Sequence, residues 1–346
     1  MKIGFVAPPW LPVPPVGYGG TESVIDRLAR GVQARGHEVC LVTTGDSTCP
    51  VPTVGVYPRP PSVPIGDAVS ELHHLVNGYA AIADCDVVHD HTVFGPVYAA
   101  GHHPGIPLAT TNHGPFTPAL RDIFRASARC AAVIAISRAQ AASAGDVPIA
   151  RVIHHGLDVD TVPVGAGDGG YLAYLGRMAP EKGAREAALI ARRAGIPLLM
   201  AAKMNEPAEL EYFTAEVEPL LGGDIEYVGE VGGRAKTDLL GGAVALLNPI
   251  SWPEPFGLVM IEALACGTPV VTHPLGAAPE IVDDGVTGYL PTTAAEVPAA
   301  LERATTLDRR ACRRAAEDRF STERMVDEHL ELFEELAAER PVTVAA

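Results

Sequence analysis

Short apolar runs alternate with longer segments in which apolar residues recur every three or four positions, the pattern of repeated strands and helices. Residues 3–7 are expected to form a buried strand, residues 21–35 a helix with Thr21 as its N-cap, and residues 39–43 the next strand. The proline-rich residues 48–63 predict an irregular excursion. Further strands are expected at residues 87–88, 108–111, 133–136 and 152–153. This order is typical of a doubly wound α/β lobe.

The same alternation begins again after a glycine-rich stretch, residues 154–170, that lacks a regular pattern and predicts an interdomain linker. Residues 293–338 predict charged helices. We therefore expect a first Rossmann-like lobe over residues 1–163, a second over residues 164–319, and a C-terminal helix in residues 320–346 that crosses back to the first lobe. Strands of the second lobe are expected at residues 171–175, 198–201, 225–228, 244–247 and 270–271.

The stretch Ser-Trp-Pro-Glu-Pro-Phe-Gly-Leu-Val-Met-Ile-Glu, residues 251–262, carries two carboxylates around a predicted helix start. Prolines at 253 and 255 predict that the helix begins near Gly257 and ends before residues 267–269. Glu254 then precedes the helix, and Glu262 lies in a helix that is apolar on nearly every side, where a carboxylate needs partners. The alternative is that Glu254 is a solvated loop residue and Glu262 a surface position of the helix. Free amides at a helix start suit a phosphate and carboxylates suit hydroxyls, so we expect a site for a diphosphate and a sugar.

Cations and glycines elsewhere fit the same ligand. Arg177 and Lys182 share one strand-to-helix loop, where they are placed to clamp a diphosphate, and Lys182 is one of only four lysines. Gly19 and Gly20 lie between the first strand and helix, where a tight turn and an anion-binding loop are equally good interpretations. The alternative is that Arg177 and Lys182 are ordinary solvent-exposed surface residues.

Two predicted strands of the first lobe run into histidines, at Val-Val-His89-Asp-His91 and Thr-Thr-Asn-His113. Ligands bind at the carboxyl ends of strands in open α/β sheets, which favours His113 as a functional residue. A metal pair at His89 and His91 is disfavoured, because alternating strand positions are expected to point to opposite faces and no third ligand is evident.

The predicted helix after Pro118 carries Arg121, Arg125 and Arg129 at fourfold spacing, which places them on one stripe. A solvated face is the favoured interpretation. A docking surface for an anionic acceptor or a lipid headgroup is the functional one.

Composition narrows the class of protein. A formal charge of −16 argues against nucleic acid as a partner. Six scattered cysteines without a C-x-x-C pair predict reduced, buried thiols in a cytoplasmic protein, and no apolar run is long enough to span a membrane. The N-terminus does not have the pattern of a signal peptide.

Taken together, the Gly19-Gly20 pair, the Gly-Arg177 to Lys182-Gly segment and the Pro-Glu254-Pro-Phe-Gly to Glu262 segment resemble the GT4 family of retaining glycosyltransferases with the GT-B fold. The resemblance covers nearly the whole chain, and the segment from Pro253 to Glu262 is its most specific part. It implies two Rossmann-like lobes that face a central cleft, the first on the acceptor side and the second holding a nucleotide-sugar donor.

The resemblance also implies a role for each matching position. His113 would lie near the reacting sugar, Arg177 and Lys182 would neutralise the leaving diphosphate, and Glu254 would contact sugar hydroxyls. Glu262 would hold the ribose, and backbone groups at Val231 would read the base. The amides of Gly19, Gly20, Phe256, Gly257 and Leu258 would meet phosphate and sugar.

The implied reaction is transfer of a hexosyl group with retention from a UDP-sugar, or from a GDP-sugar, to a hydroxyl acceptor that is a small molecule, a saccharide or a lipid-linked molecule. No cofactor and no metal are expected, since cationic side chains and helix dipoles replace the metal and no Asp-x-Asp is convincing. The segment His-His-Gly-Leu-Asp158 departs from the usual Pro-Asn-Gly-x-Asp, which leaves the role of that loop open. Three segments are similar to a subgroup that includes enzymes of orthosomycin antibiotic glycosylation: residues 16–20, 88–91 and 229–233.

Two alternatives remain at this point. One is a GT-B nucleotide-sugar epimerase, which the segment from Glu254 to Glu262 disfavours. The other is an inactive partner protein that binds nucleotide sugars, against which the joint presence of His113, Arg177, Lys182 and Glu254 argues. The sequence does not identify the base, the sugar, the acceptor, the linkage or the oligomeric state.

Overall fold

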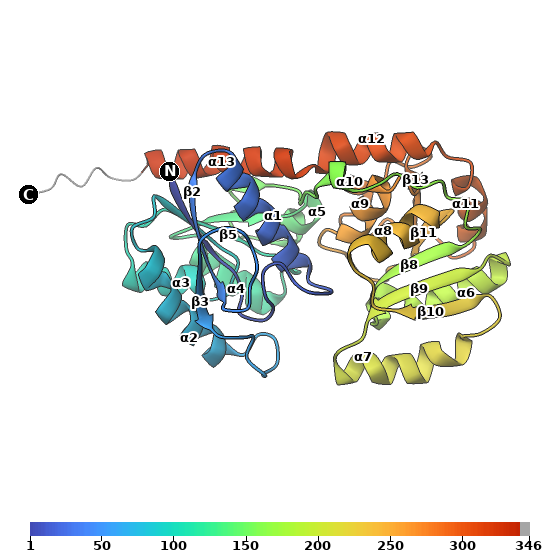
Figure 1. Ribbon diagram of the computed structural model, residues 1–346, viewed down its shortest axis with the longest axis horizontal. Helices are drawn as coiled ribbons and strands as arrows, with labels where there is room; N and C mark the ends of the chain where they lie inside the picture. The colour runs from blue at the N-terminus through green and yellow to red at the C-terminus, as the bar shows by residue number, and fades with distance from the viewer. Residues whose placement is uncertain (340–346) are drawn as a thin grey trace, which may run out of the picture. The chain divides into compact units, whose positions relative to one another are not determined.

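The computed structural model describes residues 1–339, which form two compact units, each with a parallel sheet between layers of helices (Figure 1). The first unit contains Met1–Gly156 and the helix that begins at Thr322, and the second is Leu157–Ser321. The chain therefore passes from one unit to the other twice. Residues 340–346, the end of the C-terminal segment expected at residues 320–346, lie outside the described residues.

The first unit is built on a parallel sheet in the order β3-β2-β1-β4-β5-β6-β7. Strand order reverses between β1 and β4, as in dinucleotide-binding folds, so the chain winds outward from the middle of the sheet in both directions. The strands are β1 (Lys2–Val6), β2 (Glu38–Thr44), β3 (Thr53–Tyr57), β4 (Val87–Asp90), β5 (Leu108–Thr111), β6 (Ala132–Ala135) and β7 (Arg151–Val152).

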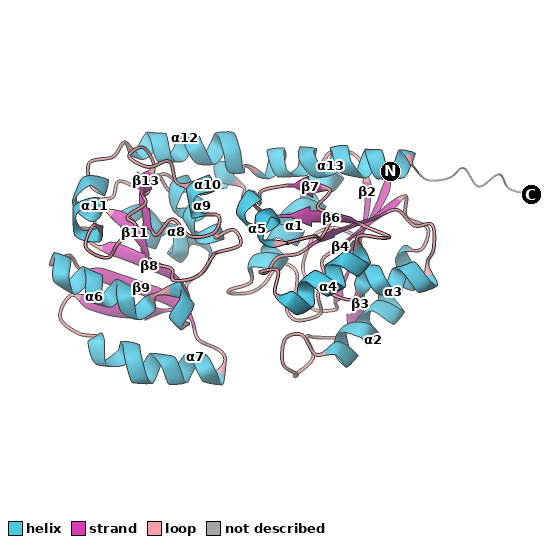
Figure 2. Ribbon diagram, turned by 180° about the vertical axis from the view of Figure 1, so that it is seen from behind, coloured by secondary structure: helices cyan, strands magenta, loops and turns pink. Residues whose placement is uncertain are grey.

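Helices cover both faces of this sheet (Figure 2). Alternate residues of a strand point to opposite faces, so Val6 and Val88 pack with Leu75 on one face, while Phe5 lies against His89 and Phe333 on the other. The helices are α1 (Gly20–Ala34), α2 (Ala68–Gly78), α3 (Gly95–His102), α4 (Pro118–Ser127), α5 (Arg138–Ser143) and α13 (Thr322–Ala338), with a 3₁₀ turn η1 (Tyr79–Ile82).

The last helix, α13, is part of the first unit. Gly31 of α1 lies so close to α13 that an added Cβ would come within 2.4 Å of a methyl group of Val326. Arg324 of α13 donates to the carbonyl oxygen of His154 at 2.6 Å, and Arg151 of β7 pairs with Glu335 at 2.5 Å. The C-terminal helix therefore supplies one side of the core of the unit in which the chain begins.

The second unit repeats the plan with a parallel sheet in the order β10-β9-β8-β11-β12-β13, which reverses between β8 and β11. Leu172, Tyr174 and Met200 are fully buried under α6 and α11 on one face, and α8 and α9 lie on the other. The strands are β8 (Leu172–Arg177), β9 (Leu198–Lys203), β10 (Ile225–Gly229), β11 (Ala245–Asn248), β12 (Val270–Thr272) and β13 (Gly288–Tyr289). The helices are α6 (Ala184–Ala194), α7 (Pro207–Tyr212), α8 (Gly233–Gly242), α9 (Leu258–Ala265), α10 (Ala278–Ile281), α11 (Val297–Ala304) and α12 (Arg309–Phe320). Short helical turns complete it: η2 (Val159–Thr161), η3 (Pro180–Lys182), η4 (Phe213–Val217) and η5 (Glu218–Leu220).

The glycine-rich segment expected to be a linker is hydrogen-bonded along the second unit. The amides of Gly165, Gly167 and Gly169 donate to backbone carbonyl oxygens of that unit at 3.0 Å each. Arg309 of α12 donates to the carbonyl oxygen of Gly165 at 2.9 Å and to that of Ala243 at 3.0 Å. Most of this stretch is therefore fixed to one body.

Three local expectations are corrected. The N-cap of the first helix is Gly19, not Thr21, and the proline-rich stretch contains the strand β3, because its residues 53–57 pair in parallel with β2. Helix α4 ends at Ser127, so Arg129 does not continue the predicted arginine stripe. The helix of the central segment begins at Leu258 after the N-cap Gly257, and its last residue is Ala265, which confirms the prediction made from the flanking prolines and glycines.

Candidate functional site

The central segment lies at the reversal point of the second sheet. The loop after β8 carries Lys182, and the loop after β11 carries Glu254, so both follow the carboxyl ends of the two strands between which the strand order reverses. A parallel sheet leaves a crevice at this point, since the two chains leave the sheet toward opposite faces. The candidate site of the second unit is therefore where a ligand is expected in this architecture.

The two loops touch each other directly. The amide of Ser251 donates to the carbonyl oxygen of Glu181 at 3.0 Å. Gly183 has a positive φ of 76°, and a Cβ on it would lie 2.1 Å from the carbonyl oxygen of Pro249. Only glycine allows both this backbone conformation and this approach. The contact holds the two loops together and brings their side chains within reach of each other.

Lys182 and Glu254 form an ion pair, with 2.5 Å between Nζ and Oε2. The two side chains are only 16% and 11% exposed, so the pair is screened little by water. Trp252, which the sequence did not single out, donates from Nε1 to the same Oε2 at 3.0 Å, and its ring centre lies 4.5 Å from Nζ of Lys182. These contacts engage Oε2 and leave Oε1 as the oxygen of Glu254 that can accept from a ligand.

A second loop fixes the backbone of Glu254. Gly276 has a φ of 58°, and a Cβ on it would lie 2.2 Å from the carbonyl oxygen and 2.4 Å from the nitrogen of Glu254. The amide of Ala277 donates to that carbonyl oxygen at 2.9 Å. The loop after β12 therefore holds the backbone of Glu254 in place. Gly276 and Glu254 are far enough apart in the sequence that no local pattern reveals this contact.

Glu262 has a lysine partner of its own. Its Oε1 lies 2.6 Å from Nζ of Lys236, which belongs to α8, and both side chains are half-buried. This meets the expectation that a carboxylate in the apolar helix α9 has a partner. At the start of that helix, the side chain of Phe256 is buried against Phe320, while Leu258 is half-buried. The first amides of an α-helix such as α9 have no hydrogen-bond partner in a preceding turn, and their N–H groups point out of the N-terminal end of the helix.

Arg177, the last residue of β8, lies in a separate group of charges. It pairs with Glu181, and its Nε lies 3.9 Å from Oε1 of Glu209. Glu209 is buried and also accepts from Lys203 at 3.2 Å. Val231 lies between β10 and α8, half-buried. Arg177 therefore ends a strand, whereas the sequence predicted that it lies in the loop with Lys182. All five predicted residues belong to the same unit: Arg177, Lys182, Val231, Glu254 and Glu262.

The matching part of the first unit also lies beside its reversal point. Gly19 and Gly20 begin α1 after the loop that follows β1, and an added Cβ on Gly19 would lie 2.6 Å from Pro15. Glu22, in the first turn of α1, is buried, and burial raises the pKa of its carboxyl to about 7. A carboxyl that gains a proton near neutral pH does not oppose an anion at the start of this helix.

His113 follows β5 in the same unit and belongs to a cluster of five histidines that the sequence did not foresee. Its Nε2 lies 2.8 Å from Nδ1 of His91, and its ring stacks on that of His155 with 5.2 Å between centres. Burial lowers the pKa of His113 to about 3 and that of His329 to about 4. Burial also holds the pKa values of the other three far below the usual range, so the cluster is neutral at pH 7. Its members are His89, His91, His113, His155 and His329.

The predicted orientation of His89 and His91 was wrong. Their ring centres are 4.0 Å apart, because residues two positions apart along a strand share a face. Within residues 1–339, no group of three or more His, Cys, Asp or Glu side chains is arranged to hold a metal ion.

Arg125 of α4 is engaged in ion pairs within the first unit. Arg125 pairs with Asp122 at 2.7 Å and with Asp146 at 2.5 Å, and these contacts raise the pKa of its guanidinium. The stripe therefore offers less free positive charge than its spacing predicts.

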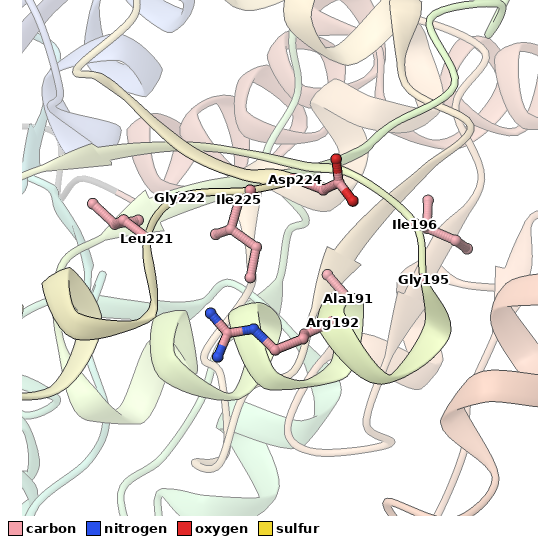
Figure 3. A pocket seen from close by; sticks show the side chains of 9 residues that line it. Ala191, Arg192, Gly195, Ile196, Leu221, Gly222, Asp224 and Ile225 are labelled. Atoms are coloured by element: carbon pink, nitrogen blue, oxygen red, sulfur yellow. The ribbon is translucent and has the colours of Figure 1, made fainter.

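A surface hollow of about 480 Å³ lies at the opposite end of the second unit from Lys182. It is bordered by the end of α6 and the first residues of β10, including Arg192 and Ile225 (Figure 3). Arg192 donates to the carbonyl oxygen of Leu220 at 2.7 Å, which is a structural contact. This hollow lies at the amino ends of the strands. Ligands of open α/β sheets bind at the carboxyl ends instead, so we do not assign a ligand to it.

Two further findings concern the whole described chain. None of the six cysteines forms a disulfide; four are buried, and Cys40 and Cys130 are half-buried. Of the helices within residues 1–339, none combines the length and the apolar content needed to cross a bilayer.

Comparisons with known proteins agree with this architecture. The model described as Glycosyltransferase Family 4 matches residues 18–161, and that described as Glycosyl transferases group 1 matches residues 169–306. Phosphatidyl-myo-inositol mannosyltransferase of Mycolicibacterium smegmatis is 28% identical over 328 residues, which cover 84% of this chain and 80% of that protein.

Solved structures share the fold over almost the full length. The structure of AviGT4, a glycosyltransferase involved in avilamycin A biosynthesis, aligns with a TM-score of 0.74 and 29% identity and covers 98% of each chain. That of Anabaena HepE in complex with UDP and glucose aligns with a TM-score of 0.75 and covers 96% of this chain and 99% of that one. At 21% identity, the second likeness shows the fold alone.

Proposed function

We propose, from the premise that this chain is a glycosyltransferase of family 4 with the GT-B fold, that it transfers a hexosyl group with retention from a nucleotide-diphosphate sugar to a hydroxyl acceptor. UDP-sugars are favoured over GDP-sugars, as the resemblance of the sequence to the family implies, and a protein of the same fold, Anabaena HepE, has been solved in complex with UDP. The likeness to AviGT4 favours a natural-product acceptor over other hydroxyl compounds.

The observation that carries this proposal is the ion pair of Lys182 and Glu254 at the reversal point of the second sheet. A sugar diphosphate offers a partner to each member of the pair: anionic oxygens for the lysine and hydroxyl donors for the carboxylate. The donor can bind with the ion pair intact, because the remaining N–H groups of Lys182 can donate to phosphate oxygens and a sugar hydroxyl can donate to Oε1 of Glu254. A molecule with only one of these two groups leaves either the lysine or the glutamate without a new partner.

We assign the other residues the roles that the resemblance to the family implies. Arg177 joins Lys182 in neutralising the diphosphate as it leaves, which lowers the barrier because the charge develops in the transition state. Glu262 holds the ribose hydroxyls, and backbone groups at Val231 read the base. The amides of Gly257 and Leu258 contact phosphate and sugar. In the first unit, His113 contacts the reacting sugar, and the amides of Gly19 and Gly20 contact the diphosphate.

The test is release of UDP or GDP from a panel of nucleotide sugars, with and without candidate acceptors and in the presence of a chelator. Acceptor-dependent release that survives chelation supports a metal-independent transferase. Conversion of the donor to its epimer would identify an epimerase instead. Binding of donors without any turnover would refute the transferase and support an inactive partner protein that binds nucleotide sugars. A thermal-shift screen of the same donors identifies the base and the sugar, since a ligand that binds the folded state raises its melting temperature.

A further inference from the structure

A hydrogen bond between two histidine rings decides which face of His113 can serve a substrate. His91 and His113 follow neighbouring paired strands, β4 and β5, and Nδ1 of His91 lies 2.8 Å from Nε2 of His113. That distance is a normal hydrogen bond between nitrogens. One of the two atoms must therefore carry a proton and the other a lone pair.

Both rings are neutral at pH 7, as their burial requires. A neutral imidazole has a single N–H, so the proton in the shared bond fixes the tautomer of both rings together. If His91 donates from Nδ1, its Nε2 is a bare lone pair, and His113 carries its own proton on Nδ1. If His113 donates from Nε2, His91 carries its proton on Nε2, and Nδ1 of His113 becomes an acceptor.

The surroundings of His91 choose between these two arrangements. Its Nε2 is buried and has no hydrogen-bond partner within the described residues. The ring of Phe5 stacks on that of His91, with 6.4 Å between centres, and His89 lies against another side at 4.0 Å. A buried N–H without an acceptor is among the rarest defects in folded proteins, and an unused lone pair is tolerated better. The arrangement in which His91 donates is therefore favoured.

We propose that His91 is a positioning residue, which donates from Nδ1 to Nε2 of His113 and so makes Nδ1–H of His113 a hydrogen-bond donor to an oxygen of the sugar donor. This rests on the proposed function only in assigning the substrate. The tautomer itself follows from the contacts within the first unit. The stacked ring of His155 completes the arrangement, because it sets the plane in which His113 presents its N–H.

Nitrogen NMR of the ligand-free protein tests the tautomer directly. In protein labelled with ¹⁵N at histidine, we expect Nδ1 of His113 to have the shift of a protonated nitrogen and Nε2 that of an unprotonated one. For His91 we likewise expect the proton on Nδ1. A proton on Nε2 of His113 in the wild-type protein overturns the proposal, whether or not the protein is active.

A matched pair of variants tests the consequence for catalysis. Asparagine and leucine have the same branched shape, but the asparagine amide nitrogen lies where Nδ1 of histidine lies and can donate in its place. We expect His91→Leu to lower kcat/KM about tenfold or more, with both tautomers of His113 visible, whereas His91→Asn retains the tautomer and most of the activity. His89→Gln is the control within the same cluster, because His89 bonds to Thr111 and not to His113.

Equal losses in the leucine and asparagine variants would reduce His91 to a packing residue and contradict the proposal. So would full activity in the leucine variant. If the leucine variant does not fold, the tautomer in the wild-type protein and the activity of the asparagine variant still test whether His91 positions His113. A wild-type protein that releases no nucleotide refutes the proposed function, while the NMR measurement judges the role of His91 separately.

Discussion

Every lysine of this chain lies against a carboxylate. Lys2 pairs with Asp84 on the surface, Lys203 with Glu206 and Glu209, Lys182 with Glu254 and Lys236 with Glu262. The last two pairs join residues far apart in sequence and fix both partners before any ligand arrives. A lysine that is already ordered loses little further freedom on binding a phosphate, so its contribution to binding is larger than that of a mobile surface lysine.

We expect Lys182→Ala and Glu254→Gln each to lower turnover about 100-fold or more while the protein stays folded, because each residue acts where charge or hydroxyl contacts change during the reaction. Steady-state rates with the preferred donor measure the loss, and circular dichroism checks the fold. Lys2→Ala removes a lysine from an exposed ion pair and should leave the rate unchanged. Near-normal turnover in either site variant removes that residue from the mechanism.

Trp252 links the two partners of the central ion pair. Trp252→Phe retains a ring beneath Lys182 and loses the N–H bond to Glu254, whereas Trp252→Leu loses both. We expect a loss in kcat/KM of a few-fold for phenylalanine and of about tenfold or more for leucine. Fluorescence supplies a second measurement, since Trp252 is one of two tryptophans. In a Trp10→Phe background, the emission of Trp252 should change when the donor binds; unchanged emission together with a normal rate in Trp252→Leu would contradict this role.

At the level of elements, the strand-to-helix loops of the second unit are locked by close backbone contacts. Gly276→Ala is expected to destabilise the protein by more than about 2 kcal/mol, because it adds the cost of a positive φ to a collision with the backbone of Glu254. Gly195→Ala is the matched control, since Gly195 also has a positive φ of 66° but lies in open space. Urea unfolding of the two variants separates the two costs. Equal destabilisation would show that the contact with Glu254 relaxes freely.

The elements that the sequence predicts well are those with local signals. Prolines and glycines around residues 253–269 bound α9 correctly, since they act on their own backbone. Strand β3 was missed because its prolines suggest a loop, whereas its pairing with β2 decides the outcome. Gly276 and Lys236 were missed for a related reason: their contacts with Glu254 and Glu262 join separate loops and helices, and a single sequence contains no sign of such contacts.

For the whole molecule, the buried histidines set the response to acid. The pKa of His329 is about 4 in the folded protein and near 6.5 in the unfolded chain, so the unfolded chain binds more protons between these values. Stability is therefore lost as pH falls through this window, by up to about 3 kcal/mol for a shift of this size. Asp90 acts in the opposite sense, because burial raises the pKa of its carboxyl to about 7 and the folded protein binds the extra proton.

We expect urea midpoints of the first unit to fall between pH 6.5 and 4, less steeply in His329→Phe and more steeply in Asp90→Asn. The emission of Trp10 in a Trp252→Phe background reports on the first unit alone, since that tryptophan belongs to it. Identical slopes in all three proteins would show that these groups do not govern the acid response.

The return of α13 to the first unit has a consequence for the order of synthesis. A ribosome finishes residues 1–156 long before it makes α13, and until then Phe5 and His89 lack the Phe333 side chain that covers them. The unit that is translated first is therefore the last to be completed. We expect residues 157–321, expressed alone, to fold as a separate body, and residues 1–156 to need the missing helix, added as a peptide, before they show a cooperative unfolding transition. A premature stop after residue 321 would thus remove residues from the C-terminus but destabilise the first unit, which contains the N-terminus.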